Sequence, residues 1–333
     1  MKDVQYGPLN VTVRAKETVL LVQDDFFRLL AAESLSQALD MLRDTSYRTE
    51  IERMEGDEYA YHEMLADELV DTFNELYALV PDKRILELAS LFYAYHNIKI
   101  FFKEKYSEAK LDHLLIHVSP HPVDVYRQAV LSGQSNVLSA EYIYSIQQAQ
   151  ADYDDFEDIH KLDIILDRCY YRHLALLAEE IGQEKIIDLV KLWIDLDNIS
   201  MALRAIKLKR SPNFLQGILS SYGSLDKQNL VNHAKEGKES FVSYLSTSPY
   251  YQCLETSMND VGDVDIERFE QAADNMKTEK FQEAKMISFG PLPVLAYCHA
   301  KQTEIKNLRI ILSAIENQID RGKIEEKFRM NYR

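Results

Sequence analysis

Glycine and proline are scarce in this chain of 333 residues. It has 10 glycines and 8 prolines, together about 5% of the residues, whereas an average protein has roughly 12%. These two residue types shape most tight turns. A chain with so few of them is expected to fold mostly into helices, and its length corresponds to two or three compact modules.

The few glycines are also scattered, which excludes the common phosphate-binding loops. Such loops need clustered glycines, because only glycine lets the backbone approach phosphate oxygens closely. The nearest pair, Gly217 and Gly223, is followed by Ser224 and Leu225 rather than by Lys and Ser or Thr. We therefore expect no direct nucleotide binding and no nucleotide cofactor.

Cysteine is rare as well, and Cys169, Cys253 and Cys298 are widely spaced. This spacing provides neither a disulfide framework nor a CxxC metal site, which is typical of a reducing cytosolic setting. Cys169 and Cys298 lie in apolar or aromatic runs, and no Gly-x-Ser-x-Gly sequence is present. Buried core cysteines are therefore favoured over nucleophiles, and we expect no catalytic residues.

Long apolar runs are absent from the chain. No stretch free of Asp, Glu, Lys and Arg exceeds about fifteen residues, whereas a membrane-spanning helix needs about 20. No apolar signal core follows residues 1–6. We expect a soluble protein that meets a membrane only through a partner.

Basic residues are too few to balance the acidic ones, and the formal net charge is −16. Such a surface repels nucleic acid, so we expect no nucleic-acid partner. Half of the excess negative charge lies in residues 50–71, which hold nine acidic residues and one arginine. Charge runs of this kind are usually the solvated faces of helices.

One histidine run has the spacing of a metal site. His113, His117 and His121 are four residues apart, which on a helix would place them along one stripe. Pro120 and Pro122 are expected to end such a helix just before them and to remove His121 from the stripe. We expect solvent-facing or capping histidines at a helix end, with a ligand set as the alternative.

Helical periodicity is clear near the N-terminus. Residues 35–42 have the apolar spacing of an amphipathic helix. Ser34 and Asp24 are expected to be N-caps near the starts of such helices, because their short side chains can accept hydrogen bonds from the first backbone N–H groups.

An internal repeat links four asparagines: Asn10, Asn97, Asn198 and Asn307. Apolar residues follow each of them at one, three and five positions further on, and the asparagines are 87, 101 and 109 residues apart. Apolar residues on so many sides predict a mostly buried helix. Each asparagine is expected to hydrogen-bond a neighbouring backbone or side chain, with a role in partner binding as the alternative.

Two further pairs of segments resemble each other, at spacings compatible with that of the asparagines; we call each such pair an echo. Residues 158–167 resemble residues 265–274, and residues 42–47 more weakly resemble residues 245–250. Several matches that agree on one period favour three homologous helical modules of about 100 residues.

We place these modules at residues 1–105, 106–205 and 206–333, the third closing against the N-terminal helix. Three similar modules can stack as an open solenoid or close into a ring with approximate threefold symmetry. A copy of the repeated helix at both chain ends favours closure.

Several segments resemble one known family. Residues 289–311, which begin with Phe-Gly-Pro-Leu-Pro, are similar to the signature of the C subunit of the rotary V-type/A-type ATPases (ATP synthases), whose eukaryotic V-ATPase counterpart is the d subunit. Residues 6–16, 95–99 and 163–173 are similar to other parts of that family, so the resemblance covers essentially the whole chain.

The resemblance implies an all-α protein with three related modules in a pseudo-threefold, funnel-like arrangement. It implies a non-catalytic adapter of the central stalk, monomeric within the complex and peripheral at the cytoplasmic face of the membrane. The implied partners are the D and F subunits of the central shaft and the membrane proteolipid ring. The adapter would transmit torque for ATP-coupled H⁺ or Na⁺ transport and would hold no cofactor or metal.

The resemblance also gives the acidic run a sharper interpretation. One acidic cluster would face a basic shaft tip and steer assembly, most strongly at low salt. The candidate shaft-facing residues are Glu50, Glu52, Glu55, Asp57 and Glu58. Two alternatives keep the helices: a repeat scaffold that binds peptide or protein partners outside any rotary machine, and an enzyme whose histidine run binds metal.

Overall fold

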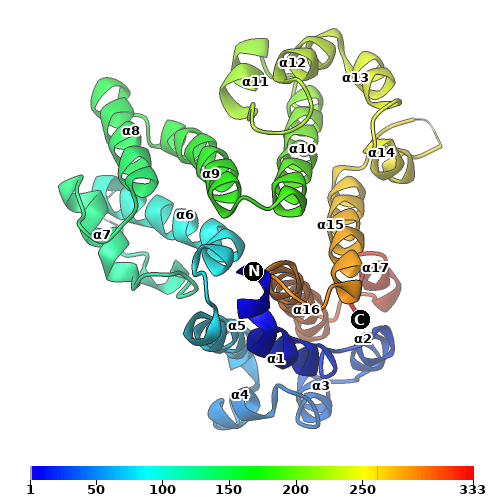
Figure 1. The fold of residues 1–333 in the computed structure, drawn as a ribbon. Helices are drawn as coiled ribbons and strands as arrows, with labels where there is room; N and C mark the ends of the chain where they lie inside the picture. Colours follow the sequence, from blue (N-terminus) through cyan, green and yellow to red (C-terminus); the bar gives the residue numbers. More distant parts are fainter. Residues whose placement is uncertain (1, 108, 261) are drawn as a thin grey trace. The chain divides into compact units, whose positions relative to one another are not determined.

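The computed structural model describes residues 2–107, 109–260 and 262–333, and Figure 1 shows the helices in chain order. Of the described residues 74% are helical, and none of them forms a β-strand. The predicted all-α fold is therefore confirmed.

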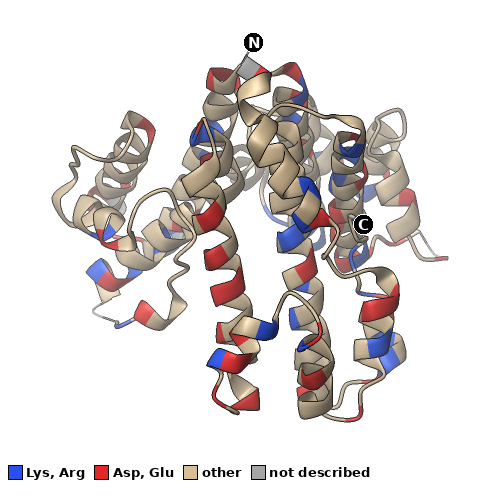
Figure 2. Cartoon of the chain, turned by 60° about the horizontal axis from the view of Figure 1, so that its bottom comes forward, with Lys and Arg blue, Asp and Glu red and all other residues tan. Residues whose placement is uncertain are grey.

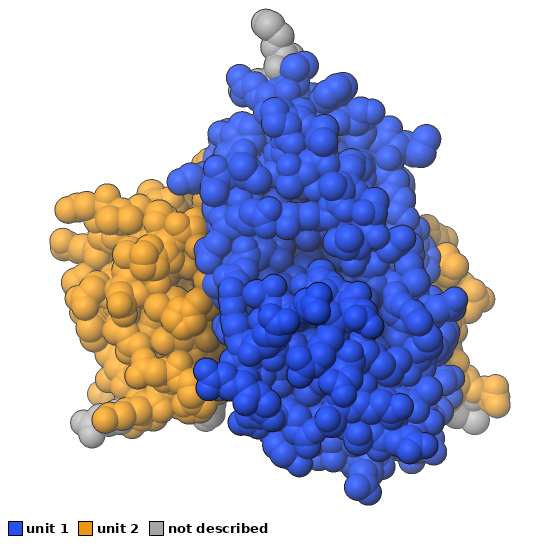
Figure 3. Space-filling model, turned by 90° about the horizontal axis from the view of Figure 1, so that it is seen from below, with its two compact units in different colours: residues 1–86, 271–333 blue, residues 87–270 orange. Residues whose placement is uncertain are grey.

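Contacts divide the chain into two compact units, which Figure 3 colours separately. Unit 1 contains residues 1–86 and 271–333, so it joins the two ends of the sequence, and unit 2 contains residues 87–270. Both divisions fall inside long helices, α6 (Arg84–Ser107) and α15 (Ile266–Gln282). The three-module division concerns sequence repetition rather than contacts, and it stays a prediction.

Unit 1 is built around one buried helix, α16. Its helices outside α6 and α15 are η1 (Lys2–Tyr6), α1 (Gly7–Glu17), α2 (Gln23–Leu30), α3 (Leu35–Leu42), α4 (Arg48–Arg53), η2 (Glu58–Ala60), α5 (Tyr61–Leu79), η4 (Glu283–Met286), α16 (Leu292–Glu316) and α17 (Arg321–Glu325). α16 packs against α1, α2, α3 and α5, and 17 of its 25 residues are buried. A helix covered on most sides must be apolar on most sides, which agrees with the pattern that follows Asn307.

Unit 2 is a series of packed helical pairs. Its helices outside α6 and α15 are η3 (Asp112–Leu114), α7 (Val123–Ser132), α8 (Ala140–Phe156), α9 (Ile159–Ile181), α10 (Glu184–Lys207), α11 (Pro212–Ile218), α12 (Lys227–Glu236), α13 (Lys238–Leu245) and α14 (Tyr251–Ser257). α9 packs against α8 and α10, and α12 packs against α10, α11 and α13. Eleven of the 24 residues of α10 are buried, Asn198 among them.

Of the two predicted N-caps, the structure confirms Ser34 but not Asp24. Ser34 caps α3, because its side-chain oxygen accepts a hydrogen bond from the backbone N–H of Gln37 at 3.2 Å. Asp24 is not an N-cap: α2 begins one residue before it, and Val22 occupies the cap position. The side chain of Asp25 accepts a hydrogen bond from the backbone N–H of Val22 at 2.9 Å and so fixes the earlier start.

The prediction of a helix through the histidine run is wrong. His113 lies in the short η3, and residues 115–122 are irregular. The Asn97 side chain binds both backbone groups of Ile116, accepting from its N–H at 2.9 Å and donating to its C=O at 2.7 Å. Because a side chain of α6 satisfies both backbone groups of Ile116, this residue does not need helical hydrogen bonds.

Candidate functional site

The five candidate shaft-facing acids lie on α4, on the turn that follows it and at the start of η2. Glu52, Glu55 and Asp57 are exposed, and Glu58 is half-buried. Glu50 differs from them, since only 6% of its surface is exposed. The five residues are therefore not one solvent-facing cluster.

The acidic run continues along α5, and Figure 2 shows where acidic and basic residues fall along the helices. Glu63, Asp67 and Asp71 are exposed, and their four-residue spacing places them on one helix face. Glu68 lies on another face and is buried. The run thus combines a solvated stripe with two buried carboxylates, Glu50 and Glu68.

Glu68 belongs to a buried charge network centred on Lys301 of α16. The Lys301 ammonium lies 2.5 Å from the Glu68 carboxylate and 2.9 Å from that of Glu304. Glu304 also accepts hydrogen bonds from the Tyr47 hydroxyl at 2.7 Å and from the backbone N–H of Leu21 at 2.6 Å. The network ties α16 to α5, to the segment before α2 and to the start of α4.

The electrostatics of this network favour the charged lysine. Burial lowers the pKa of Lys301, but the neighbouring Glu304 and Glu68 outweigh burial, so the pKa is raised. For Glu68, burial raises the pKa more than Lys301 lowers it, and the nearby carboxylates of Glu50 and Glu304 add to the rise. Burial is thus the main reason why the pKa of Glu68 is raised.

A cavity of about 210 Å³ opens beside the network. The buried side chains of Glu50, Glu68 and Lys301 line it, together with the more exposed Asp71 and Glu75. All of these residues belong to unit 1. The cavity is thus rich in carboxylates, and two of them reach the solvent.

Three of the repeat asparagines make the same pair of hydrogen bonds. Each side chain is buried, donates to the C=O of one downstream residue and accepts from the N–H of that same residue. The distances lie between 2.7 and 3.0 Å, and the partners are Ile116 for Asn97, Ser220 for Asn198 and Arg329 for Asn307. We call this arrangement the peptide clamp; it holds a chain segment 19 to 22 residues downstream against the helix.

Asn10 departs from the other three asparagines. It is buried, but its side-chain NH₂ donates to the C=O groups of Ser288 and Gly290, at 3.3 and 3.1 Å. Its Oδ1 has no hydrogen-bond partner among the described residues. The first copy of the pattern therefore binds the segment that leads into α16 instead of its own downstream loop.

A buried carboxylate that the sequence pattern did not reveal accompanies the clamp in α10. Asp195 accepts hydrogen bonds from the Tyr250 hydroxyl at 2.7 Å and from the backbone N–H groups of Ser224 and Leu225 at 2.9 and 3.0 Å. A Cβ at Gly223 would collide with the Asp195 carboxylate. Gly223 thus allows the chain to approach a protein carboxylate rather than a phosphate.

Glu304 occupies the corresponding place in α16. Asp195 and Glu304 each precede a repeat asparagine by three residues, and each accepts a hydrogen bond from a tyrosine hydroxyl. The two tyrosines, Tyr47 and Tyr250, are the last residues of the weak echo between residues 42–47 and 245–250. Aligning the asparagines would have revealed both carboxylates.

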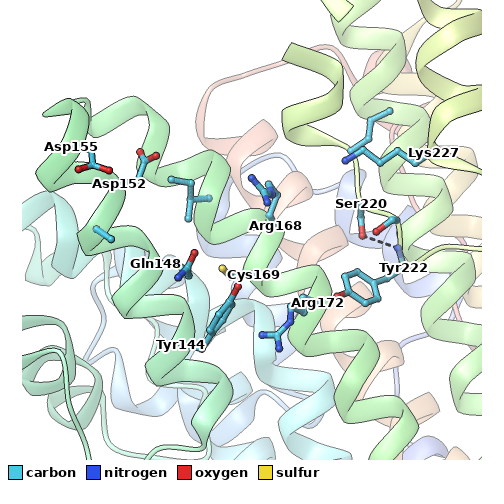
Figure 4. Close-up of a pocket in the computed structure, with 14 residues that line it drawn as sticks. Tyr144, Gln148, Asp152, Asp155, Arg168, Cys169, Arg172, Ser220, Tyr222 and Lys227 are labelled. Atoms are coloured by element: carbon cyan, nitrogen blue, oxygen red, sulfur yellow. Dashed lines mark hydrogen bonds between the residues drawn. The ribbon is translucent and has the colours of Figure 1, made fainter. Parts of the chain in front are cut away.

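Unit 2 contains a larger pocket, of about 550 Å³, shown in Figure 4. Side chains from α8, α9, α12 and the loop after α11 line it. The guanidinium of Arg172 lies over the Tyr144 ring, 4.3 Å from its centroid, and pairs with Glu141. Burial and the neighbouring Arg168 lower the pKa of Lys227. The charges are mixed, and the residues that line the pocket include no nucleophile with an adjacent base.

The other chemical groups give no sign of catalysis. All three cysteines are buried and free, and burial raises the pKa values of the Cys169 and Cys298 thiols. The described residues include no group of three His, Cys, Asp or Glu side chains that could hold a metal ion. Over the same residues, no helix combines the length and apolar composition that a membrane crossing requires.

The sequence is similar to known proteins over nearly its whole length. The profile of the ATP synthase (C/AC39) subunit family matches residues 9–327. The C subunit of the V-type sodium ATPase of Enterococcus hirae is 27% identical over 329 residues, which cover 99% of each chain. The C subunit of the A-type ATP synthase of Methanocaldococcus jannaschii is 25% identical, over 96% of this chain and 84% of that protein. Its counterpart in Thermococcus kodakarensis is 24% identical, over 98% and 90%.

The family match extends from α1 to the residues after α17 and so includes helices of both units. It agrees with the resemblance carried by residues 289–311. The chain therefore belongs to the ATP synthase (C/AC39) subunit family and is a structural, non-catalytic component of a rotary V/A-type ATPase.

Proposed function

We propose that the chain is the central-stalk adapter of its rotary ATPase. In this role it binds the central shaft, made of the D and F subunits, on one side and the membrane proteolipid ring on the other. It transmits torque between them for ATP-coupled H⁺ or Na⁺ transport. The match to the C subunits of V-type and A-type enzymes over at least 96% of the chain carries this proposal.

The mechanical demand on such an adapter fits the helices of this chain. A torque-transmitting part must not yield, and close-packed helical cores have low compressibility and transmit strain. Three helices of 24 or 25 residues, α6, α10 and α16, each carry a peptide clamp. The clamps support the role because each of them fixes a non-helical residue of a downstream segment to a rigid helix.

The repeated contacts also support three modules in a pseudo-threefold, funnel-like arrangement. In unit 2, Lys103 pairs with Asp163 at 3.2 Å, and Arg204 pairs with Glu270 at 2.6 Å. Lys103 and Arg204 each follow a repeat asparagine by six residues, and the two acids correspond in the echo of residues 158–167. The bonds from Asn10 to the segment before α16 support closure of the third module against the N-terminal helix.

We further propose that the protein is peripheral, at the cytoplasmic face of the membrane, and a monomer within the complex. The absence of a membrane-crossing helix from the described residues is compatible with attachment through partners. The relative from Enterococcus hirae is named as part of a sodium ATPase, which keeps Na⁺ beside H⁺ as the transported ion.

A reconstitution experiment tests the proposed function. The purified chain is mixed with the purified shaft and with detergent-solubilised proteolipid ring, separately and together, and complexes are isolated by size exclusion. We expect one chain per complex, and a bridge between shaft and ring that forms only when the chain is present. A chain that binds neither component would overturn the proposal and favour a scaffold outside any rotary machine.

A further inference from the structure

We propose that the cavity beside Glu50 is a socket for one lysine or arginine side chain of the shaft. This inference rests on the proposed function, because it names where the shaft is recognised. It differs from a general attraction between acidic and basic surfaces, since it assigns the recognition to one cavity in unit 1.

The depth of the side chains gives the cavity an interior and a mouth. Glu50, Glu68 and Lys301 are almost completely covered, with side chains 7%, 11% and 3% exposed. Asp71 and Glu75 lie at the mouth, where their side chains are 49% and 47% exposed. A basic side chain that enters from solvent would pass the carboxylates of the mouth before it reaches the buried carboxylates of Glu50 and Glu68.

Glu50 is the carboxylate of the cavity that would gain most from a further cation. Its Oε2 is buried and has no hydrogen-bond partner among the described residues. The nearest cation, the Arg53 guanidinium, lies 3.8 Å from the other carboxylate oxygen, which is too far for a hydrogen bond. A buried carboxylate oxygen without a partner is costly, so a donor from another molecule would stabilise it.

The charges around the cavity are also unbalanced. Lys301 is shared by Glu68 and Glu304, Lys16 pairs with Glu75 at 2.6 Å, and Arg53 pairs with Asp71 at 2.8 Å. Five carboxylates therefore face three cations: Glu50, Glu68, Asp71, Glu75 and Glu304 against Lys16, Arg53 and Lys301. One further cation would relieve this excess.

The size and composition of the cavity favour a side chain over other cationic ligands. Pockets for drug-sized ligands have volumes of about 300–1,000 Å³, whereas this one has about 210 Å³. No group of three potential ligands for a metal ion is found in the described part of the chain. An ammonium or guanidinium on a narrow aliphatic stem matches a deep acidic cavity with a charged mouth.

Removing the charge of Glu50 tests the socket. The affinity of the full chain for the purified shaft is measured at two salt concentrations, for the unchanged protein and for Glu50→Gln. Glutamine keeps the size of the side chain but carries no charge, so it cannot form an ion pair with a cation. We expect binding about 30-fold weaker, together with a smaller salt dependence, because one charge pair is lost.

The matched control is Glu63→Gln, which removes an exposed charge from α5 outside the cavity. We expect its affinity to stay within about threefold of the unchanged protein, as for an exposed charge. Equal affinity and equal salt dependence of the two variants would overturn the socket while leaving the proposed function intact. An unchanged protein that does not bind the shaft would overturn both.

A second variant keeps the test independent of the stability of Glu50→Gln. Ser46 is exposed and lines the same cavity. Ser46→Trp should obstruct the cavity while every carboxylate stays in place, and we expect it also to weaken shaft binding. If Ser46→Trp binds the shaft as tightly as the unchanged protein, the cavity is not the socket.

Discussion

Lys301 shows how one buried cation organises the interior of unit 1. Its ammonium lies between Glu68 and Glu304 and 4.4 Å from the centroid of the Tyr47 ring, so the charge is covered on several sides. Burying such a charge is favourable only when its partners stay in place. The same partners raise the pKa of Lys301, so it stays charged at neutral pH.

Replacing Lys301 should therefore strongly destabilise the folded protein. Lys301→Met keeps most of the apolar stem of the side chain but removes its charge, so the buried carboxylates of Glu68 and Glu304 lose their shared cation. We expect a loss of about 3–5 kcal/mol in the free energy of unfolding at pH 7, measured by urea denaturation.

The control is Lys280→Met. Lys280 pairs with Glu283 at the surface, where the two side chains are 50% and 60% exposed. An exposed pair contributes at most about 1 kcal/mol. Equal losses for the two variants would contradict a stabilising role for the buried network.

At the scale of the element, the peptide clamp explains why the repeated helices carry asparagine. An asparagine side chain offers one donor group and one acceptor, as a backbone peptide does, and can therefore pair with both backbone groups of one residue. In α10 the clamped residue is Ser220, and both of its bonds are buried. The clamp satisfies a buried loop peptide that would otherwise have no partner.

Removing one clamp should loosen its loop. Asn198→Ala leaves the buried N–H and C=O of Ser220 unsatisfied, and we expect a loss of about 1–3 kcal/mol in the free energy of unfolding. The amide hydrogen of Ser220 should exchange faster with solvent, as measured by mass spectrometry. Asn136→Ala, at an exposed loop position, is the control and should change neither quantity. Unchanged exchange at Ser220 in Asn198→Ala would speak against the clamp.

At the same scale, the sequence predicted the helices that carry the asparagines but not the residues that these asparagines bind. The apolar spacing after each asparagine predicted a mostly buried helix, because a 3.6-residue period can be read directly from the residues. The prediction is correct for α16, but it is wrong for α1, where only three of 11 residues are buried and Val11 is exposed. The clamped residue, 19 to 22 positions downstream, could not be predicted, since it depends on the path of the loop. The histidine spacing misled for the same reason: Asn97 holds Ile116 in an irregular segment, and the helix that the spacing assumed does not form.

At the scale of the whole molecule, each unit contains a histidine with a lowered pKa: His173 is buried, and His299 is half-buried. Burial and the neighbouring Arg172 lower the pKa of His173 in unit 2 to about 4. Burial also lowers the pKa of His299 in unit 1 to about 4, against the opposing pull of Asp274. Their rings contact the hydroxyls of Tyr95 and Thr278, at 3.3 and 2.9 Å.

These histidines predict acid destabilisation of both units. An unfolded histidine takes up a proton near its ordinary pKa of 6.5, while the folded one stays neutral down to about 4. The neutral histidines therefore contribute fully to the free energy of unfolding above pH 6.5. This contribution is lost as the pH falls toward 4, by up to about 3 kcal/mol for each histidine. Urea denaturation at several pH values measures it.

The variants His173→Gln and His299→Gln should each flatten the loss of stability between pH 6.5 and 4. His62→Gln, at an exposed position on α5, should leave it unchanged. A pH dependence that is the same in all three variants would show that His173 and His299 do not cause the acid sensitivity.

The sequence by itself determined the helical class, the four helices that carry the repeat asparagines and the family. These depend on local composition, short-range periodicity and motifs that stay recognisable in a linear chain. The tertiary structure alone decided that Glu50 and Glu68 are buried, that Lys301 and Glu304 meet Tyr47, and that a cavity opens beside them. An acidic side chain looks the same in sequence whether it faces water or a lysine far along the chain. Only packing brings those groups together, and burial then gives their charges the strength that exposed charges lack.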